Sequence, residues 1–138
     1  MKETEKNVAQ RDTRQRRMVY DAVLRLADHP TAEAVYETVH AQDARVSKAT
    51  VYRNLNLLAE NGEIRRVPMP DADRFDHTTT RHAHLHCAVC GGVWDAPLPY
   101  AEENDAAVAE KTGFLIRCHE TVFEGVCPAC RAESEKKG

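Results

Sequence analysis

The sequence predicts an α+β fold in two small parts, one mainly helical and one of mixed helix and strand. Three observations lead to this class. Apolar residues recur at helical spacing over residues 12–60, a short hairpin pattern follows, and two Cys-x-x-Cys pairs frame the second half. The 138 residues fit one ordinary domain or two small ones, and 42% hydrophobic residues exclude wholesale disorder. Small cores of this kind usually need a metal, a disulfide or a partner subunit.

Three helices are expected in the N-terminal part, at residues 12 to about 28, 32 to about 41, and 48–60. The first ten residues are expected to be frayed. Capping side chains and helix breakers mark the boundaries of these helices. The caps and breakers are His29-Pro30, Thr31, Ser47 and Asn61-Gly62. The residues expected to face inward are Val19, Ala22, Val23, Leu26, Ala34, Val35, Val39, Val51, Leu55 and Leu58.

A hairpin is expected after the third helix. Residues 63–67 and 74–77 have the pattern of two short strands, and turn-forming residues 68–73 join them. Three helices followed by a hairpin is the pattern of a winged helix-turn-helix, in which the hairpin forms the wing. We assign this domain to residues 1–77, and we expect the polar residues 78–83 to form a hinge.

The second domain is expected to be a mixed α/β unit over residues 84–138. Strands are expected at about 83–88 and 92–96, on either side of the first Cys-x-x-Cys pair. A helix is expected from about 100 to 112, followed by a long alternating strand over 114–123. The charged tail 131–138 is expected to be disordered.

Four of the five cysteines form the pairs Cys87-x-x-Cys90 and Cys127-x-x-Cys130. Four thiolates satisfy tetrahedral zinc, and such a closed site contributes folding energy directly. The alternative is a pair of disulfides, which a cytosolic chain disfavours. We therefore expect a structural Zn²⁺ site. Cys118 lies on the expected strand and is taken as a packed or half-exposed cysteine rather than a ligand.

A second group of potential ligands lies around the hinge. Its members are Asp76, His82, His84 and Asp95, and the two histidines share one face of an extended segment. By the same periodicity His86 also belongs to that face. Imidazoles and carboxylates suit iron, manganese or zinc. The alternative is that these are ordinary surface or capping histidines, as we take His40 and His77 to be.

The charge distribution is compatible with nucleic-acid binding. The total of −3 argues against it, but residues 1–80 carry 13 basic and 13 acidic side chains and residues 81–138 carry 6 and 9. Arg11, Arg14, Arg16 and Arg17 crowd into seven residues beside one acidic residue. This cluster is either a solvated helix start or a DNA contact, because DNA binding needs a positive face and not a positive total.

Several motifs together resemble the ferric uptake regulator (Fur) family over about residues 12–130. They are His29-Pro-Thr-Ala, Ser47-x-x-Thr-Val-Tyr-Arg-Asn-Leu, Arg74-Phe-Asp76, His82-x-His-Leu-x-Cys-x-x-Cys-Gly, and His119 through Gly125-Val-Cys127-x-x-Cys130. The resemblance implies a homodimer with a winged helix at each tip and a C-terminal dimerisation domain. It also implies that the metal-bound form represses transcription by binding double-stranded operator DNA.

Carried over by position, the resemblance implies a regulatory metal site with five ligands. These are His29, Asp76, His82, His84 and Asp95. Ligands from both sides of the hinge would let the bound ion favour one of two domain arrangements.

Aspartate at positions 76 and 95 resembles the peroxide-sensing PerR branch of the family. Iron-responsive members typically have Glu at position 95, and zinc-responsive members supply a Cys near position 76. In the PerR branch, bound Fe²⁺ reacts with hydrogen peroxide and oxidises a ligand corresponding to His29 or His82. The alternatives are a repressor that senses iron or manganese (Mn²⁺) without peroxide chemistry.

The chain departs from the family pattern at three places. The usual Thr-Pro-Gln-Arg entry to the DNA-binding helix reads Thr13-Arg-Gln-Arg16. A further metal site of iron-responsive members would use positions 81, 83, 102 and 119. This chain has Arg81, Ala83, Glu102 and His119 there, so we expect that this site does not form. His86 stands where an apolar residue is usual, and the sequence gives no reason for it.

The helix that begins after Ser47 is expected to enter the major groove of DNA. Since Val51, Leu55 and Leu58 face inward, their neighbours must face outward. The expected readers on this helix are Lys48, Thr50, Tyr52 and Arg53. Arg14, Arg16 and Arg17 are expected to contact phosphates, which fix register rather than sequence.

The remaining expectations concern location and chemistry. No run of about 18 apolar residues exists and the charged N-terminus lacks the apolar stretch of a signal peptide, so we expect a cytoplasmic protein without a membrane partner. A zinc hydrolase that uses the histidines and aspartates is a remote alternative. No further side chain is placed to act as base or nucleophile, so we expect neither catalysis nor a small organic substrate.

Overall fold

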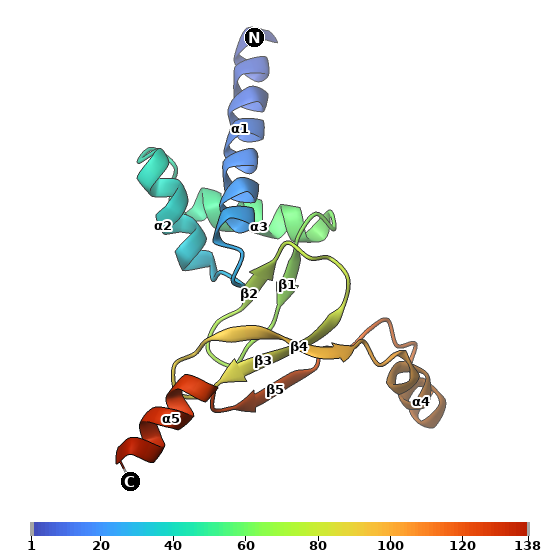
Figure 1. Ribbon diagram of the computed structural model, residues 1–138. Helices are drawn as coiled ribbons and strands as arrows, with labels where there is room; N and C mark the ends of the chain where they lie inside the picture. Colours follow the sequence, from blue (N-terminus) through green and yellow to red (C-terminus); the bar gives the residue numbers. More distant parts are fainter. Residues whose placement is uncertain (1, 138) are drawn as a thin grey trace. The chain divides into compact units, whose positions relative to one another are not determined.

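The computed structural model describes residues 2–137, with side chains described over 10–136. The chain divides into two compact units, Met1–Thr79 and Thr80–Gly138. The first unit is mainly helical, and the second is built around a three-stranded sheet (Figure 1). None of the helices in the described range is long and apolar enough to cross a membrane.

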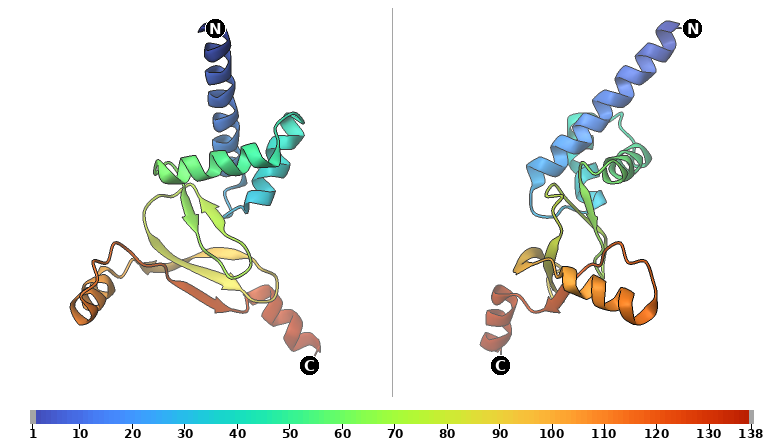
Figure 2. Two further views of the ribbon diagram at one scale, coloured as in Figure 1. Left: turned by 180° about the vertical axis from the view of Figure 1, so that it is seen from behind. Right: turned by 90° about the vertical axis from the view of Figure 1, so that its right-hand side faces the viewer.

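Three helices and a hairpin form the first unit (Figure 2). The helices are α1 (Lys2–Leu26), α2 (Ala32–Gln42) and α3 (Lys48–Glu60), and the hairpin pairs β1 (Arg65–Val67) with β2 (Arg74–Asp76) in antiparallel register. The predicted winged helix-turn-helix is thus confirmed. The buried apolar residues of its core are Val19, Ala22, Val23, Val35, Val39, Val46, Val51, Leu55, Leu58, Ile64 and Phe75.

The predicted N-caps of α2 and α3 are confirmed. Thr31 Oγ1 accepts a hydrogen bond from the backbone N–H of Ala34 at 3.1 Å, and Ser47 Oγ accepts one from that of Thr50 at 3.1 Å. Each cap satisfies an N–H group that has no partner within the helix, and contributes about 1 kcal/mol. After α3, Gly62 turns the chain with a φ of 77°, which glycine adopts without steric cost.

The first helix differs from its prediction at both ends. α1 begins at Lys2, so the expectation of a frayed start is wrong for residues 2–10. That segment contains neither Gly nor Pro and is rich in good helix formers, so the helix continues towards the N-terminus. α1 ends at Leu26, two residues earlier than expected, and the next residue, Ala27, has left the helical region with a φ of 56°.

The second unit is organised around a sheet of order β4-β3-β5. β3 (His82–Cys87) pairs antiparallel with β4 (Val93–Pro99) across the tight connection that carries the first Cys-x-x-Cys pair. β3 pairs in parallel with β5 (Val122–Gly125). A parallel neighbour requires a crossover, which α4 (Glu102–Thr112) and the segment after it provide (Figure 1).

The predicted long strand over 114–123 is wrong for most of its length. Only Val122–Gly125 forms a strand, where the edge of β3 is available for pairing. Within the described residues, 114–121 belongs to no strand, and Phe114 and Leu115 are 71% and 88% exposed. Alternation of apolar and polar residues predicts which face of a strand is apolar. A strand also requires hydrogen-bond partners for its backbone groups, which the alternation does not predict.

The predicted disorder of the tail is also wrong for the residues described. α5 spans Pro128–Lys137, with proline at its first position, where the missing N–H costs nothing. Alanine, glutamate and lysine follow, all good helix formers, and Arg131 Nε lies 3.3 Å from Glu135 Oε1 one turn later. Gly138 lies outside the described residues.

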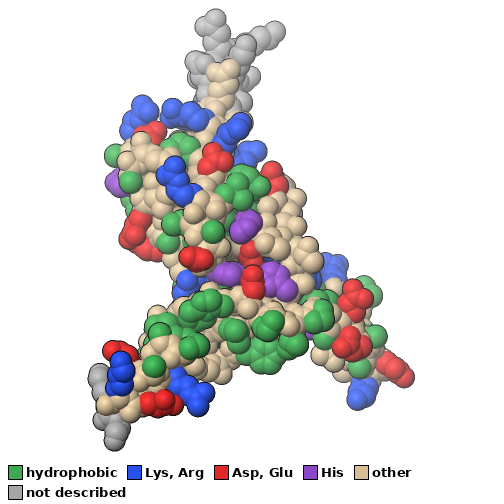
Figure 3. All heavy atoms as spheres, viewed as in Figure 1, with side chains coloured by type: hydrophobic (Ala, Val, Ile, Leu, Met, Phe, Trp, Pro, Cys, Tyr) green, Lys and Arg blue, Asp and Glu red, His purple; other side chains and the backbone are tan. Residues whose placement is uncertain are grey.

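One face of the second sheet is apolar and open. Leu85, Trp94 and Phe123 from its three strands are 38%, 45% and 45% exposed, and they line a cavity of about 390 Å³. Hydrophobic side chains gather over this sheet in the space-filling view (Figure 3). The indole of Trp94 lies over Gly92, where an added Cβ would be 2.5 Å from it, so this approach requires glycine.

Candidate metal centres and nucleic-acid interface

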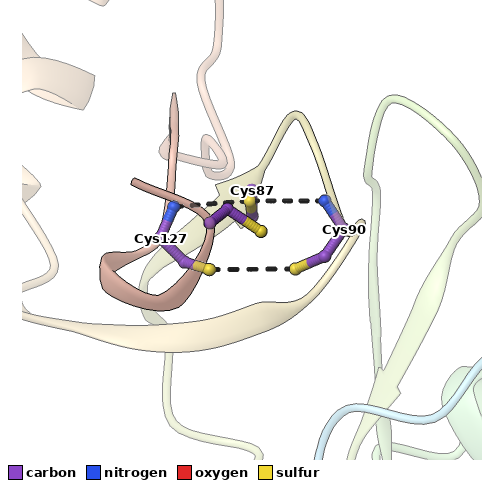
Figure 4. A group of neighbouring side chains, drawn as sticks. Cys87, Cys90 and Cys127 are labelled. Atoms are coloured by element: carbon purple, nitrogen blue, oxygen red, sulfur yellow. Dashed lines mark hydrogen bonds between the residues drawn. The ribbon is translucent and has the colours of Figure 1, made fainter. Parts of the chain in front are cut away.

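The two Cys-x-x-Cys pairs come together at one end of the second sheet. Cys87 ends β3, Cys90 lies in the following turn, and Cys127 lies opposite them (Figure 4). Cys127 and Cys130 flank the start of α5. The four Sγ atoms lie within 4.8 Å of one another, and those of Cys90 and Cys127 are 3.9 Å apart. The predicted four-cysteine cluster is confirmed, and its sulfurs can close around a tetrahedral zinc ion.

Backbone N–H groups stabilise a thiolate in this cluster. The N–H groups of Cys90 and Cys127 point at Cys87 Sγ, at 3.4 and 3.3 Å, and these hydrogen bonds lower the pKa of Cys87 to about 6. The hydrogen bond with Cys127, together with burial, raises the pKa of Cys130 to about 12. A thiolate therefore forms more readily at Cys87 than at Cys130, and four thiolates together require a cation to balance their charge. Cys118 is exposed and stands apart from this cluster.

In the first unit, His29 and Asp76 form a buried pair. His29 Nε2 lies 3.4 Å from Asp76 Oδ2, and the residues are 7% and 4% exposed. The backbone N–H of Thr78 donates to Asp76 Oδ1 at 2.8 Å, which leaves Oδ2 for the imidazole. His29 has a φ of 54°, a strained value for a non-glycine residue, and Arg74 Nη1 donates to its carbonyl at 3.2 Å. Backbone strain of this kind is concentrated at functional positions.

In the second unit, two histidines meet one carboxylate across β3 and β4. Asp95 Oδ1 lies 2.7 Å from His82 Nε2 and 3.6 Å from His84 Nε2. His84 is opposite Asp95 in the strand register, and an irregularity between His82 and His84 brings their ring centroids to 4.4 Å. His82 Nδ1 donates to the carbonyl of Thr80 at 2.7 Å, which turns Nε2 towards the carboxylate.

Each unit therefore presents metal-ligand side chains of the same chemistry. The first offers one imidazole and one carboxylate, and the second offers two imidazoles and one carboxylate. Nitrogen and oxygen donors of this kind suit Fe²⁺, Mn²⁺ or Zn²⁺, whereas the sulfur cluster selects zinc.

The structure supplies a reason for His86, which the sequence did not. His86 is 5% exposed, and its Nδ1 lies 3.5 Å from Glu124 Oε1 on the neighbouring strand β5. It lies beside this carboxylate and is not a member of the group around Asp95. Sequence reasoning missed Glu124, because only the register of β5 on β3 brings the two side chains together.

Two of the positions of the further family metal site are engaged in other contacts. Arg81 Nη1 lies 3.1 Å from Glu120 Oε1. His119 Nδ1 lies 2.6 Å from Asp105 Oδ1, and its ring stacks on Tyr100, which also donates to Asp105. Hydrogen bonds from Tyr100 and His119 lower the pKa of Asp105. Sequence reasoning did not single out Asp105 or Tyr100.

The residues expected to read DNA lie on the outer side of α3. Lys48, Tyr52 and Arg53 are exposed, whereas Thr50 is half-buried and its hydroxyl accepts a hydrogen bond from Ser47 at 2.9 Å. On α1, Arg14 and Arg17 are exposed and Arg16 is half-buried. Lysine and arginine side chains gather on this unit near α1 in Figure 3.

Acidic side chains that the sequence analysis did not consider form ion pairs with two of these cations. Arg14 Nη2 lies 3.1 Å from Asp43 Oδ2, and Lys48 Nζ lies 2.7 Å from Glu33 Oε2. In both pairs the partners are far apart in sequence, so no local sequence pattern predicts the contact.

A winged helix followed by a domain with a four-cysteine cluster and imidazole and carboxylate ligands defines a metal-binding, DNA-binding regulator. The chain belongs to the ferric uptake regulator family, whose model matches residues 7–123. It is 34% identical over 129 residues to the peroxide operon regulator of Bacillus subtilis (strain 168), with 93% of this chain and 89% of that protein covered.

Solved structures agree with this assignment. The crystal structure of the Campylobacter jejuni peroxide stress regulator superposes with a TM-score of 0.74 at 26% identity, over 94% of this chain and 98% of that one. A zinc uptake regulator complexed with zinc and DNA superposes with a TM-score of 0.70 at 26% identity, over 96% and 93%. The chain is thus a regulator of this family that is similar to its peroxide-responsive members.

Proposed function

We propose that this chain is a metal-dependent transcriptional repressor that binds double-stranded operator DNA as a homodimer and is inactivated by peroxide. The observation that carries the peroxide response is the ligand chemistry. Aspartate stands at both positions 76 and 95, each beside a histidine, and the chain is similar in sequence to peroxide-responsive repressors.

The regulatory ion in this proposal is Fe²⁺ or Mn²⁺, bound by three imidazoles and two carboxylates. The ligands are His29, Asp76, His82, His84 and Asp95. In support, the pairs in each unit are held by backbone contacts, and their donors are the type that these ions prefer. An ion that takes ligands from both units binds one arrangement of them more tightly, and by linkage it favours the form that binds DNA.

Bound iron would supply the electrons that reduce peroxide, and the protein's part is to hold oxidisable imidazoles beside it. The Thr80 carbonyl accepts from Nδ1 of His82 and so fixes its tautomer, and Nε2, 2.7 Å from Asp95 Oδ1, is the nitrogen that would bind the ion. Oxidation of His29 or His82 would remove one ligand and weaken the link between the units. DNA release would follow from that weakened link.

The four-cysteine site is proposed to hold a structural Zn²⁺ through Cys87, Cys90, Cys127 and Cys130. This ion would join the end of β3 to the start of α5 and compensate for a small core. The second unit is proposed to dimerise, and its open apolar face and the exposed side chains of Phe114 and Leu115 are surfaces that a second copy would cover.

DNA reading is assigned to α3 and phosphate contact to α1. The proposed readers are Lys48, Thr50, Tyr52 and Arg53, and the proposed phosphate contacts are Arg14, Arg16 and Arg17. Their exposure and the winged-helix framework support these roles. We further propose the domain division 1–77, hinge 78–83 and 84–138, and a cytoplasmic location, where operator DNA lies.

Binding rather than catalysis is the proposed activity. Each carboxylate of the regulatory group is needed as a ligand, which leaves no base for a hydrolase that acts on a small organic substrate. The competing candidate is an iron- or manganese-sensing repressor without peroxide chemistry, which the same ligand types support.

One experiment separates these candidates. Protein purified without oxygen would be analysed for metals, loaded with Fe²⁺ or Mn²⁺, and treated with hydrogen peroxide before its operator affinity is measured. We expect peroxide to abolish DNA binding of the iron form only, with one oxygen atom added to a peptide that contains His29 or His82. Operator binding by the iron form that survives peroxide, or oxidation confined to cysteines, would favour the metal-sensing candidate.

A further inference from the structure

Glu33 in the first turn of α2 contacts two of the proposed DNA readers at once. Its Oε2 lies 2.7 Å from Lys48 Nζ, and the Tyr52 hydroxyl donates to the same oxygen at 3.4 Å. The Lys48 ammonium also lies 5.8 Å from the centroid of the Tyr52 ring and 5.9 Å from that of Tyr36. Glu33 is therefore the centre of a small cluster on the outer side of α3.

The contact is electrostatic and exposed. Glu33 and Lys48 have exposed side chains, at 54% and 51%. The hydrogen bond to Lys48 lowers the pKa of Glu33, and the same bond raises the pKa of Lys48. Both side chains are therefore charged at any pH at which the protein binds DNA. An exposed pair of this kind contributes little to folding. Its consequence lies in the charge that α3 presents to DNA.

We propose that Glu33 is a specificity determinant that suppresses binding to arbitrary DNA sequences. This inference rests on the proposed function, in which α3 reads the operator. Non-specific affinity comes almost entirely from cations that replace counterions at phosphates. Glu33 neutralises Lys48 and repels phosphate, so a sequence that offers only phosphates gains little from this part of α3.

An operator is bound differently, because it also offers base edges. Contacts of Lys48 and Tyr52 with bases compensate for the separation of these side chains from Glu33. The side chains have room to move, because Glu33 and Tyr52 line an open groove of about 470 Å³ between α2, α3 and the wing. Specificity rises since the carboxylate weakens non-specific binding more than operator binding.

Two further pairs in the first unit place a carboxylate beside an arginine. Arg14 lies 3.1 Å from Asp43, and Arg66 of the wing lies 3.4 Å from Asp73. Glu33 is the strongest case, because it contacts two proposed base readers, whereas Asp43 and Asp73 each contact an arginine that is not a proposed base reader.

The test compares Glu33→Gln with Glu37→Gln in the metal-loaded full-length protein. Both changes remove one negative charge from an exposed residue of α2, but only the first removes the partner of Lys48. Affinity for an operator duplex and a scrambled duplex would be measured by fluorescence anisotropy over a range of salt concentrations. We expect Glu33→Gln to tighten scrambled-duplex binding roughly threefold to fivefold and to steepen its salt dependence by up to about one counterion, with a smaller gain on the operator. Glu37→Gln should leave the ratio of the two affinities unchanged.

A double variant decides whether Lys48 carries the effect. In a Lys48→Gln background, Glu33→Gln should have a much smaller effect on the scrambled duplex, because only the direct repulsion between carboxylate and phosphate remains, and an undiminished gain there would overturn the proposal. Loss of operator affinity in Glu33→Gln alone would also overturn it, by indicating a direct contact of Glu33 with a base. If Lys48→Gln and Tyr52→Phe both left operator binding intact, the proposed reading role of these two residues would fail instead.

Discussion

Single carboxylates determine what the proposed regulatory site can do. Asp95 Oδ1, on the adjacent strand, lies 2.7 Å from His82 Nε2 and 3.6 Å from His84 Nε2. The residue is 60% exposed, whereas His84 is fully buried, so this carboxylate faces solvent while the imidazole does not. A longer side chain at position 95 can still reach the two imidazoles, but it places its oxygens differently around an ion.

Asp95→Glu tests this dependence on length. The variant should retain metal-dependent operator binding, because nitrogen and oxygen donors are conserved, but lose most of the peroxide oxidation of His29 or His82. The extra methylene changes the position of the carboxylate and with it the access of peroxide. Peptide mass spectrometry of the iron-loaded variant after peroxide, beside the parent protein, measures the outcome. Equal oxidation in both proteins would show that the length of this side chain is irrelevant.

At the scale of helices and strands, local features were predictable and long-range pairs were not. The caps Thr31 and Ser47 act within three residues, so the sequence alone places α2 and α3. The short β5 and the helical tail were mispredicted, because strand pairing depends on the edge of β3 and the charged tail also has high helix propensity.

The candidate sites follow the same division. Ligand types and Cys-x-x-Cys spacing are visible in the sequence, and the four cysteines indeed converge. The pairs Glu33 with Lys48 and His86 with Glu124 depend on helix packing and strand register. No spacing rule contains that information.

The proposed structural zinc ion would link the end of β3 to the start of α5. Cys87→Ser should release zinc and break the dimer or unfold the second unit, because the cysteine nearest the backbone donors is lost and the unit buries little apolar surface. Cys118→Ser is the matched control, since this cysteine is exposed and outside the cluster. Zinc content and sedimentation measure the result. A zinc-free Cys87→Ser protein that remained folded and dimeric would refute the structural role of the site.

For the molecule as a whole, the basic side chains proposed to contact DNA are balanced by acidic side chains in the same domain. Residues 1–80 have no net charge, although they contain the basic side chains proposed to meet DNA. Intramolecular carboxylates contribute to this balance, because Asp43 and Glu33 are paired with Arg14 and Lys48. DNA recognition in this protein is therefore expected to depend on the position of individual cations more than on their total.

The division between phosphate contacts and base readers gives the last prediction. Arg16→Ala should weaken binding to operator and scrambled duplexes by about the same factor and reduce the salt dependence by about one counterion, because a phosphate contact carries no sequence information. Tyr52→Ala with Arg53→Ala should mainly weaken operator binding and so relax base preference, since both side chains are exposed on the outer side of α3. Anisotropy titrations of both duplexes at several salt concentrations distinguish the two patterns. If the double variant lost affinity equally on both duplexes, α3 would contact the backbone alone, and the reader would have to lie elsewhere on the winged helix.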